Sequence, residues 1–268
     1  MRLGRQLLAV LLLLAALLPI TACGGSSLPP QATSPQLLLP GTSGPTPIVV
    51  LVPGGSWRSA DPTGLVPLAR RLADAGFVAM TTTYRTSETG SYFPLPVQDV
   101  LCAASRAAAQ AKQAGHGGGP VVLLGHSAGA PLALLAALRP EAFRGSCSEP
   151  PVTPAAAIGL AGPYDLTALG PVAVDLFGAS AAPAAWRSGE VAQWADSRPS
   201  LPILLAHGSS DVVVPPESTQ RLAQQLTQGG HEVALELVGG AGHQEIYDPD
   251  VIAQRVIEWL RLRVPVTR

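Results

Sequence analysis

The sequence predicts an α/β fold, in which a mostly parallel, doubly wound sheet carries helices on both faces. From residue 47 onward, short apolar runs alternate with longer segments of helical periodicity, which is the order typical of this class. The apolar runs are hydrophobic throughout, and this indicates strands that are buried on both faces of a sheet. The 268 residues, 47% of them hydrophobic, suit one large domain of this kind.

Strands and helices are expected to alternate along most of this domain. Strands are expected over residues 47–52, 77–84, 121–125, 155–161, 203–207 and 233–238. Helices are expected over residues 65–75, 97–114, 128–138 and 217–226, and a last one from residue 249 through residue 260. Residues 163–200 contain no strand pattern, so we expect a small excursion over the sheet there and little or no cap.

Local signals support these elements in turn. The first strand is a β-branched run that ends at a Pro-Gly-Gly break. The first helix places Leu65, Leu68 and Leu72 on one face and stops at Gly76. The second helix is rich in alanine, and the helix over residues 217–226 ends at a Gly-Gly pair. Asp248-Pro249 predicts the start of the last helix, because a capping aspartate precedes a proline in the first turn.

Residues 1–22 have the pattern of a secretory signal peptide. Two arginines precede an apolar stretch over residues 7–18, which is short for a membrane span. Small residues and then Cys23 follow, and this junction resembles a bacterial lipobox. The resemblance implies that Cys23 becomes the lipidated first residue of an extracytoplasmic, membrane-anchored lipoprotein. The alternative is an ordinary signal peptide with an incidental cysteine.

Residues 23–46 are rich in Gly, Ser, Pro, Thr and Gln. Such a segment cannot bury enough surface to order itself, so we expect a flexible tether ahead of a domain over residues 47–268. One apolar patch, Leu37–Leu39, interrupts this composition and could instead form an edge strand of the domain.

Charge and cysteine usage narrow the range of partners. The formal net charge is −1 and 13% of the residues are charged, so nothing indicates a nucleic-acid-binding surface. No CxxC and no His/Cys cluster with the spacing of metal ligands occurs. For Cys102 and Cys147 we favour one disulfide, as expected for an exported chain, with two unrelated buried thiols as the alternative.

The segment Gly125-His126-Ser127-Ala128-Gly129 joins an apolar strand to an apolar helix. A Gly-x-Ser-x-Gly turn in that position puts the serine hydroxyl on a strained corner, at the carboxyl end of the strand. The motif alone is weak in a glycine-rich chain, and its place between strand and helix makes it specific. Ser127 is therefore the candidate nucleophile.

A serine hydroxyl needs a histidine base that a carboxylate holds in place. On this type of sheet the three residues follow in the order Ser, Asp, His. Among the five histidines, only His243 has both this order and a place after a strand end. Asp211 follows the preceding strand and is the candidate acid. The alternatives are a solvated loop histidine and a turn-forming aspartate.

Acyl transfer also needs backbone N–H groups that face the developing oxyanion. Ala128, the residue after the nucleophile, would supply one from the start of a helix. The loop after the first strand, Pro53-Gly54-Gly55-Ser56-Trp57, would supply another, because its two glycines let N–H groups turn inward. A simple turn is the alternative for this loop.

Taken together, these segments resemble the α/β-hydrolase family, and within it the lipase/esterase branch with an HGG-type oxyanion loop (carboxylesterase- or feruloyl-esterase-like). The resemblance runs over nearly all of residues 47–264 and includes the blocks TTYR, FPLPVQDVLCA, GPYDL and GGAGH. It implies that Gly55 and Ser56 supply the loop donors, with Trp57 as a neighbouring candidate. Pro53 departs from the family, which usually has a histidine there that helps to order the loop.

The sequence thus predicts a serine hydrolase that cleaves carboxylic esters through an acyl-enzyme and needs no metal or cofactor. We expect small-molecule or glycan-linked esters with short acyl groups as substrates, and attachment to a membrane through Cys23. One alternative is an amide- or peptide-cleaving enzyme, since this branch also resembles arylformamidases and dipeptidyl peptidase catalytic domains. The other alternative is a catalytically inactive lipoprotein that binds a ligand in the cleft.

Overall fold

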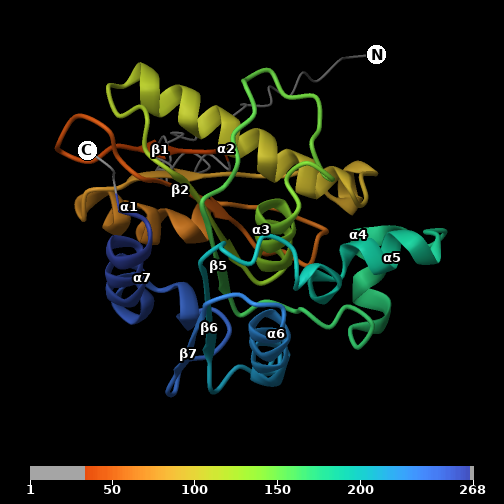
Figure 1. Ribbon diagram of the computed structural model, residues 1–268. Coiled ribbons are helices and arrows are strands. Elements are labelled where there is room, and N and C mark those ends of the chain that lie inside the picture. Colours follow the sequence, from red (N-terminus) through yellow and green to blue (C-terminus); the bar gives the residue numbers. More distant parts are fainter. Residues whose placement is uncertain (1–33, 266–268) are drawn as a thin grey trace, which may run out of the picture. The chain divides into compact units, whose positions relative to one another are not determined.

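The structure is a computed structural model that describes residues 34–265, and one sheet with helices on both faces organises this part of the chain (Figure 1). The strand order is β1-β3-β2-β4-β5-β6-β7. The strands are β1 (Leu37–Leu38), β2 (Ile48–Val52), β3 (Val78–Thr81), β4 (Val121–His126), β5 (Ala156–Leu160), β6 (Ile203–Gly208) and β7 (Val233–Val238). All neighbouring strands are parallel except β1, which runs antiparallel to β3. The predicted α/β class is confirmed.

Helices connect most of the strands. The α-helices are α1 (Val66–Asp74), α2 (Leu95–Gln113), α3 (Gly129–Leu138), α4 (Val174–Phe177), α5 (Pro183–Gly189), α6 (Pro216–Gln228) and α7 (Pro249–Arg263). Short 3₁₀ helices are η1 (Thr63–Leu65), η2 (Ser87–Thr89), η3 (Gly170–Ala173), η4 (Val191–Trp194) and η5 (Glu245–Tyr247). Each predicted helix is present, with ends that differ by a few residues, as is usual where helix termini fray.

Two apolar layers enclose the sheet, and the alternation of side chains along each strand divides residues between them. On β2, Val50 and Val52 face one layer, while Val49 and Leu51 face the other. Helices α2, α3 and α6 cover the first layer, and α1 and α7 cover the second. Every residue of β2 to β6 is buried, which explains why these segments are continuously hydrophobic.

The sheet begins earlier in the chain than predicted. Leu37 pairs with Met80, and Leu38 pairs with Ala79, so the apolar patch within the predicted tether forms the edge strand β1. The domain therefore starts before residue 47, and the sheet has seven strands where six were expected. Strand β3 is shorter than the predicted run over residues 77–84.

The predicted signal peptide, the lipidation site Cys23 and the first part of the predicted tether lie outside the described residues. Within residues 34–265, no helix combines the length and the apolar character that crossing a bilayer requires. The lipoprotein hypothesis stays a prediction.

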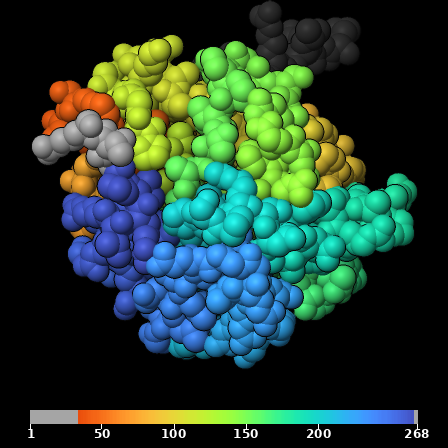
Figure 2. All heavy atoms as spheres, in the orientation of Figure 1, coloured from red at the N-terminus to blue at the C-terminus, as the bar shows by residue number. Residues whose placement is uncertain are grey.

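Residues 163–200 form the expected excursion, with the short elements η3, α4, α5 and η4 and no strand. This excursion packs on itself and on the end of α3. Phe177 stacks on Trp186 at 4.3 Å between ring centroids, and Arg139 lies 4.1 Å above the ring of Trp194. The segment, teal in the space-filling view, lies at one margin of the domain (Figure 2).

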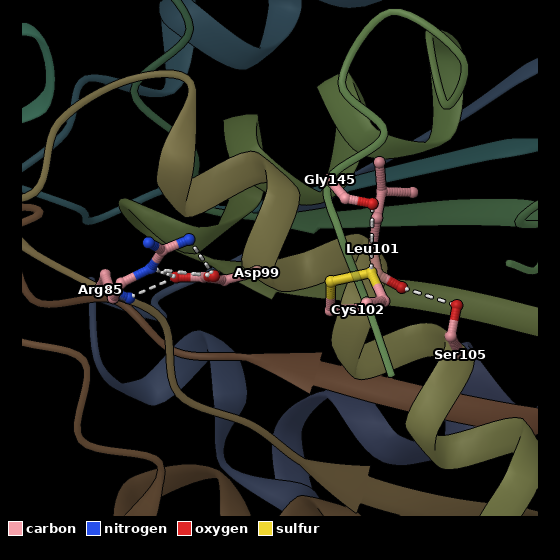
Figure 3. The surroundings of a disulfide bond; sticks show 7 residues. Arg85, Asp99, Leu101, Cys102, Ser105 and Gly145 are labelled. Atoms are coloured by element: carbon pink, nitrogen blue, oxygen red, sulfur yellow. Dashed lines mark hydrogen bonds and ion pairs between the residues drawn. A yellow bond between two sulfur atoms is a disulfide. The ribbon is translucent and has the colours of Figure 1, made fainter. Parts of the chain in front are cut away.

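A disulfide joins Cys102 on α2 to Cys147 in the segment between α3 and β5, with the two Cα atoms 5.2 Å apart. Figure 3 shows the bond beside the start of α2, where Asp99 forms an ion pair with Arg85 at 2.8 Å. The bond therefore ties an irregular segment with no helix or strand of its own to the longest helix of the described residues.

The β4–α3 turn is built on a backbone approach that only glycine permits. A Cβ atom on Gly125 would lie 2.2 Å from the carbonyl oxygen of Gly129. A Cβ atom on Gly129 would lie 2.5 Å from the carbonyl oxygens of both Val52 and Pro53. Helix α3 can therefore begin directly against the end of β2, and the intervening Ser127 takes a left-handed φ of 50°.

The Cys102–Cys147 bond encloses a loop with a sequence separation of 45 residues. Replacing both cysteines by alanine is expected to lower the free energy of unfolding by about 2 to 4 kcal/mol, because the unfolded chain regains the entropy that the cross-link removed. Urea denaturation checks this. Reduction of the wild type should lower the midpoint equally, and an unchanged midpoint after complete reduction would contradict a bond in the folded protein.

Substitution Gly129→Ala is expected to lower the free energy of unfolding by about 1 to 3 kcal/mol, because the new methyl group overlaps two carbonyl oxygens that belong to fixed backbone. Gly41→Ala is the matched control, since nothing lies within 4 Å of a Cβ atom there, and a change within about 0.5 kcal/mol is expected. Thermal and urea denaturation measure both. Equal stability of the two variants would show that the turn has room for a side chain.

Candidate functional site

The predicted site residues come from four loops at one edge of the sheet. The loop after β2 carries Gly55 and Ser56, Ser127 follows β4, Asp211 follows β6 and His243 follows β7. These strands are parallel, so their carboxyl ends lie side by side, at the edge where such sheets bind ligands.

The structure brings Ser127, Asp211 and His243 together. Nε2 of His243 lies 2.9 Å from Oγ of Ser127, and Nδ1 of the same ring lies 2.7 Å from Oδ2 of Asp211. The carboxylate accepts from Nδ1–H, which leaves Nε2 with a lone pair that faces the serine hydroxyl. This arrangement allows the ring to take the hydroxyl proton.

Backbone hydrogen bonds hold the loops after β6 and β7 against each other. The N–H of Ser209 donates to Val238 at 2.9 Å, and the N–H of Ser210 donates to Ala241 at 2.9 Å. Gly208 permits this contact, because a Cβ atom there would lie 2.2 Å from the carbonyl oxygen of Ala241. The loop with the carboxylate and the loop with the imidazole therefore share one backbone framework.

Asp211 is a buried carboxylate that remains ionised. Burial alone would raise its pKa, but hydrogen bonds from the N–H of Val214, from His243 and from the N–H of Val213 outweigh burial and hold the pKa below its ordinary value. The two backbone N–H groups donate to Oδ1 at 2.8 and 2.9 Å. Oδ1 is thus occupied by the loop, and Oδ2 is left for His243.

A second imidazole, which the sequence did not predict, binds this carboxylate. His207, the penultimate residue of β6, is fully buried, and its Nε2 lies 3.0 Å from Oδ2 of Asp211. Burial lowers the pKa of His207 and keeps the ring neutral. The available signal was its place at a strand end, four residues before the aspartate, but only the fold shows that the side chain turns back to the carboxylate.

His126, within the Gly-x-Ser-x-Gly turn, is a further neighbour that the sequence did not predict. Its Nε2 donates to the backbone carbonyl oxygen of His243 at 2.9 Å. The His126 ring lies 5.0 Å from that of His243 and 4.5 Å from that of Tyr247, measured between centroids. Burial lowers the pKa of His126 to about 4, so the ring is neutral and supports the His243 loop without adding charge.

The predicted oxyanion loop has an unusual backbone. Gly55, Ser56 and Trp57 have φ values of 121°, 53° and 58°. In residues 34–265, the backbone N–H groups of these three residues and of Ala128 donate to no protein acceptor. A Cβ atom on Gly54 would lie 2.9 Å from Cβ of Ser127, so the loop runs directly past the serine.

Two buried aromatic side chains hold this loop. The indole N–H of Trp57 donates to the carbonyl oxygen of Ala128 at 2.9 Å, and the hydroxyl of Tyr84 donates to the carbonyl oxygen of Pro53 at 3.1 Å. Trp57 was predicted as a backbone donor, yet its side chain is what joins the loop to the start of α3. These contacts fix the loop where Pro53 replaces the histidine that the resemblance led us to expect.

The loops after β2, β4, β6 and β7 line an open cleft of about 690 Å³. Gly55, Ser56, Ser127 and His243 face it, and no residue of the excursion over 163–200 lines it. Polar and apolar groups both form its wall, and the polar side chains include those of Ser56, Ser59, Asp61, Ser210, Gln244, Glu245 and Tyr247. Val212 and Val213 also line the cleft and are 96% and 65% exposed. Among the described residues, no group of His, Cys, Asp and Glu side chains is arranged to hold a metal ion.

Solved structures with the same architecture are esterases and related hydrolases by name. A truncated carbohydrate esterase from gut microbiota is 20% identical, with a TM-score of 0.73 over 87% of this chain and 91% of that one. The acetyl ester-xyloside bifunctional hydrolase from Caldicellulosiruptor lactoaceticus is 19% identical, with a TM-score of 0.71 over 85% of this chain and 88% of that one. A lipase/esterase from Lactobacillus plantarum is 20% identical, with a TM-score of 0.69 over 85% and 91% of the two chains.

At these identities the likeness establishes the fold, and no curated protein sequence matches the chain. The family comparison is more direct. The model of the BD-FAE family matches residues 36–226, from just before β1 into α6, a span that includes Ser127 and Asp211. The match covers more than half of the chain, and the chain therefore belongs to the BD-FAE family, with an α/β-hydrolase fold.

Proposed function

We propose that this protein is a serine hydrolase that cleaves carboxylic esters. The observation that carries the proposal is the position of His243 between Ser127 and Asp211, with its two ring nitrogens 2.9 and 2.7 Å from the hydroxyl and the carboxylate. A hydroxyl, an imidazole and an ionised carboxylate in this order form the machinery of acyl transfer. The names of the structural relatives, a carbohydrate esterase, an acetyl ester-xyloside hydrolase and a lipase/esterase, support the same reaction.

In the proposed mechanism, Oγ of Ser127 attacks the acyl carbon while Nε2 of His243 takes the hydroxyl proton. The charge that develops on the carbonyl oxygen is stabilised by the N–H of Ala128 and by those of Gly55 and Ser56, which have no competing protein acceptor. The intermediate collapses as His243 returns the proton to the departing alcohol. Water, deprotonated by His243, then attacks the acyl-serine, and the imidazolium gives the proton to Oγ of Ser127 as the acid leaves.

Asp211 acts through His243 in both halves of this reaction. It accepts the Nδ1 proton, which holds the ring in the tautomer that leaves Nε2 free. It also stabilises the imidazolium that forms when the hydroxyl proton moves. The hydrogen bonds that keep the pKa of Asp211 low ensure that this charge is present at neutral pH.

The shape and polarity of the cleft favour short acyl groups and polar alcohols. The cleft is open, and its wall carries hydroxyl, amide and carboxylate groups that can bond to sugar hydroxyls. The strongly exposed apolar side chains at the cleft are Val212 and Val213, and these two short side chains fit a short acyl group. We therefore propose acetylated or similarly acylated carbohydrates, or small esters, as substrates.

Replacing the proposed nucleophile tests the function directly. Ser127→Ala is expected to lower kcat on p-nitrophenyl acetate by about 10⁴-fold or more, because no other hydroxyl faces Nε2 of His243 among the described residues. Ser188→Ala on α5 is the control. The wild type should hydrolyse p-nitrophenyl esters more slowly as the acyl chain lengthens.

Full activity in Ser127→Ala would reject the proposal, and faster turnover of aminoacyl or formyl anilides by the wild type would reassign the enzyme to amide bonds. Wild type inactive on every ester and anilide would favour a ligand-binding protein.

Trp57→Phe tests the hydrogen bond that joins the oxyanion loop to the start of α3. The phenyl ring keeps most of the buried volume but loses the N–H that binds the carbonyl oxygen of Ala128. We expect kcat to fall about tenfold with little change in KM, since the loop donors act mainly in the transition state. Trp194→Phe is the matched control, because its indole also donates to a backbone carbonyl, that of Ser188. Equal kcat in both variants would show that the loop holds its position without Trp57.

A further inference from the structure

A buried imidazole, that of His207, contacts the Asp211 carboxylate and does not line the substrate cleft. Nε2 of His207 is 3.0 Å from Oδ2 of Asp211 and 2.9 Å from the carbonyl oxygen of Val214. Neither side chain of the His207–Asp211 pair is exposed to solvent. Oδ2 is the same oxygen that accepts from His243 at 2.7 Å, so it lies between two rings.

The hydrogen-bond partners determine the tautomer of His207. The carbonyl oxygen of Val214 can only accept, so Nε2 must carry a proton, which it shares between that oxygen and Asp211. Nδ1 faces the hydroxyl of Thr219 on α6 at 2.6 Å. Burial lowers the pKa of His207, so Nδ1 is unprotonated and accepts from this hydroxyl. A continuous chain of donors therefore runs from Thr219 through His207 to Asp211.

A neutral donor at this place has a specific electrostatic consequence. It occupies one lone pair of Oδ2 and leaves the negative charge of the carboxylate intact for His243. A cationic ring there would instead compete with the imidazolium that forms on His243 during acyl transfer. Among the other titratable groups, His126 lies beside His243, with 5.0 Å between ring centroids, and Tyr247 on η5 packs against His126. Among the described residues, His207 is thus the only ring other than His243 that binds the carboxylate.

We propose that His207 is a positioning residue, whose Nε2–H orients Oδ2 of Asp211 toward Nδ1 of His243 and moderates the strength of that hydrogen bond. The inference rests on the proposed function, since it assigns a role within the same site. Through His207 on β6 and Thr219 on α6, these two elements help to set the basicity of the His243 imidazole. Thr219, by donating to Nδ1, holds the His207 ring in the required orientation.

Two variants at position 207 separate positioning from filling space. His207→Gln can keep an N–H donor near the place of Nε2 and an acceptor for Thr219, whereas His207→Leu keeps similar volume and removes both. We expect His207→Leu to lower kcat about tenfold with less than a twofold change in KM, because the lost contact acts on the base and does not touch substrate. His207→Gln should recover most of kcat.

The pH dependence of kcat/KM distinguishes the two roles, because a purely structural role of His207 would leave it unchanged. Without the His207 donor, Oδ2 becomes more basic and favours protonated His243. The pH at which kcat/KM falls to half on the acid side should therefore rise, by about half to one unit in His207→Leu and hardly at all in His207→Gln. Equal profiles, with kcat and stability lowered alike in both variants, would overturn the proposal.

Position 219 provides a second pair of variants for the case in which His207→Leu does not fold. Thr219→Val removes the hydroxyl that faces Nδ1 and keeps the volume, while Thr219→Ser keeps the hydroxyl. We expect Thr219→Val to lower kcat about threefold and to shift the acid side of the profile in the same direction. Thr219→Ser should follow the wild type, and identical profiles for the two variants would count against the proposal.

Side-chain ¹⁵N NMR of histidines tests the geometry without reference to activity. The proposal predicts a neutral His207 with its proton on Nε2 at about pH 7 and above, and a shift of the Nδ1–H resonance of His243 in His207→Leu. A cationic His207, or a proton on Nδ1, would overturn it. A wild type without Ser127-dependent turnover would reject the proposed function instead, and the NMR result would still show whether His207 holds the Asp211–His243 pair.

Discussion

The close approach of two backbones at the start of α3 is the constraint on which the site depends. Gly129 lies against the carbonyl oxygens at the end of β2, and Gly54 lies against Ser127, at distances that leave no room for a side chain. This contact presses the loop after β2 onto the turn after β4. It places a nucleophilic hydroxyl beside backbone N–H groups that have no other acceptor among the described residues. A wider turn would separate the two groups that acyl transfer needs together.

Around this contact, hydrogen bonds to buried polar groups hold Asp211 and His243 in place. Asp211 receives four donors, two from its own loop and two from imidazole rings. The hydrogen bonds from Val213, Val214 and His243 outweigh burial, which alone would raise the pKa of Asp211, so the carboxylate stays charged. His126 binds the backbone of His243 from the other side. The base is therefore held both through its ring and through its main chain, while its remaining nitrogen is left for the hydroxyl.

Much of the fold could be predicted from sequence because strands β2 to β6 are buried on both faces and therefore read as nearly continuous apolar runs. The three side chains of the proposed triad could also be placed, since each follows a strand in a parallel sheet. Strand β1 was less predictable, because two leucines within a polar segment are compatible both with a flexible tether and with an edge strand. The contacts of His207 and of the Trp57 indole lay beyond prediction, since they depend on where a buried side chain points after the loops have packed.

The most direct measurement of the central claim is the site of covalent modification by an organophosphate ester such as diethyl p-nitrophenyl phosphate, mapped by mass spectrometry of the intact protein and its peptides. We expect one phosphoryl group per chain, carried by the peptide that contains Ser127, and far slower modification in His243→Ala. Modification of another residue, or an active protein that the reagent leaves unmodified, would contradict it.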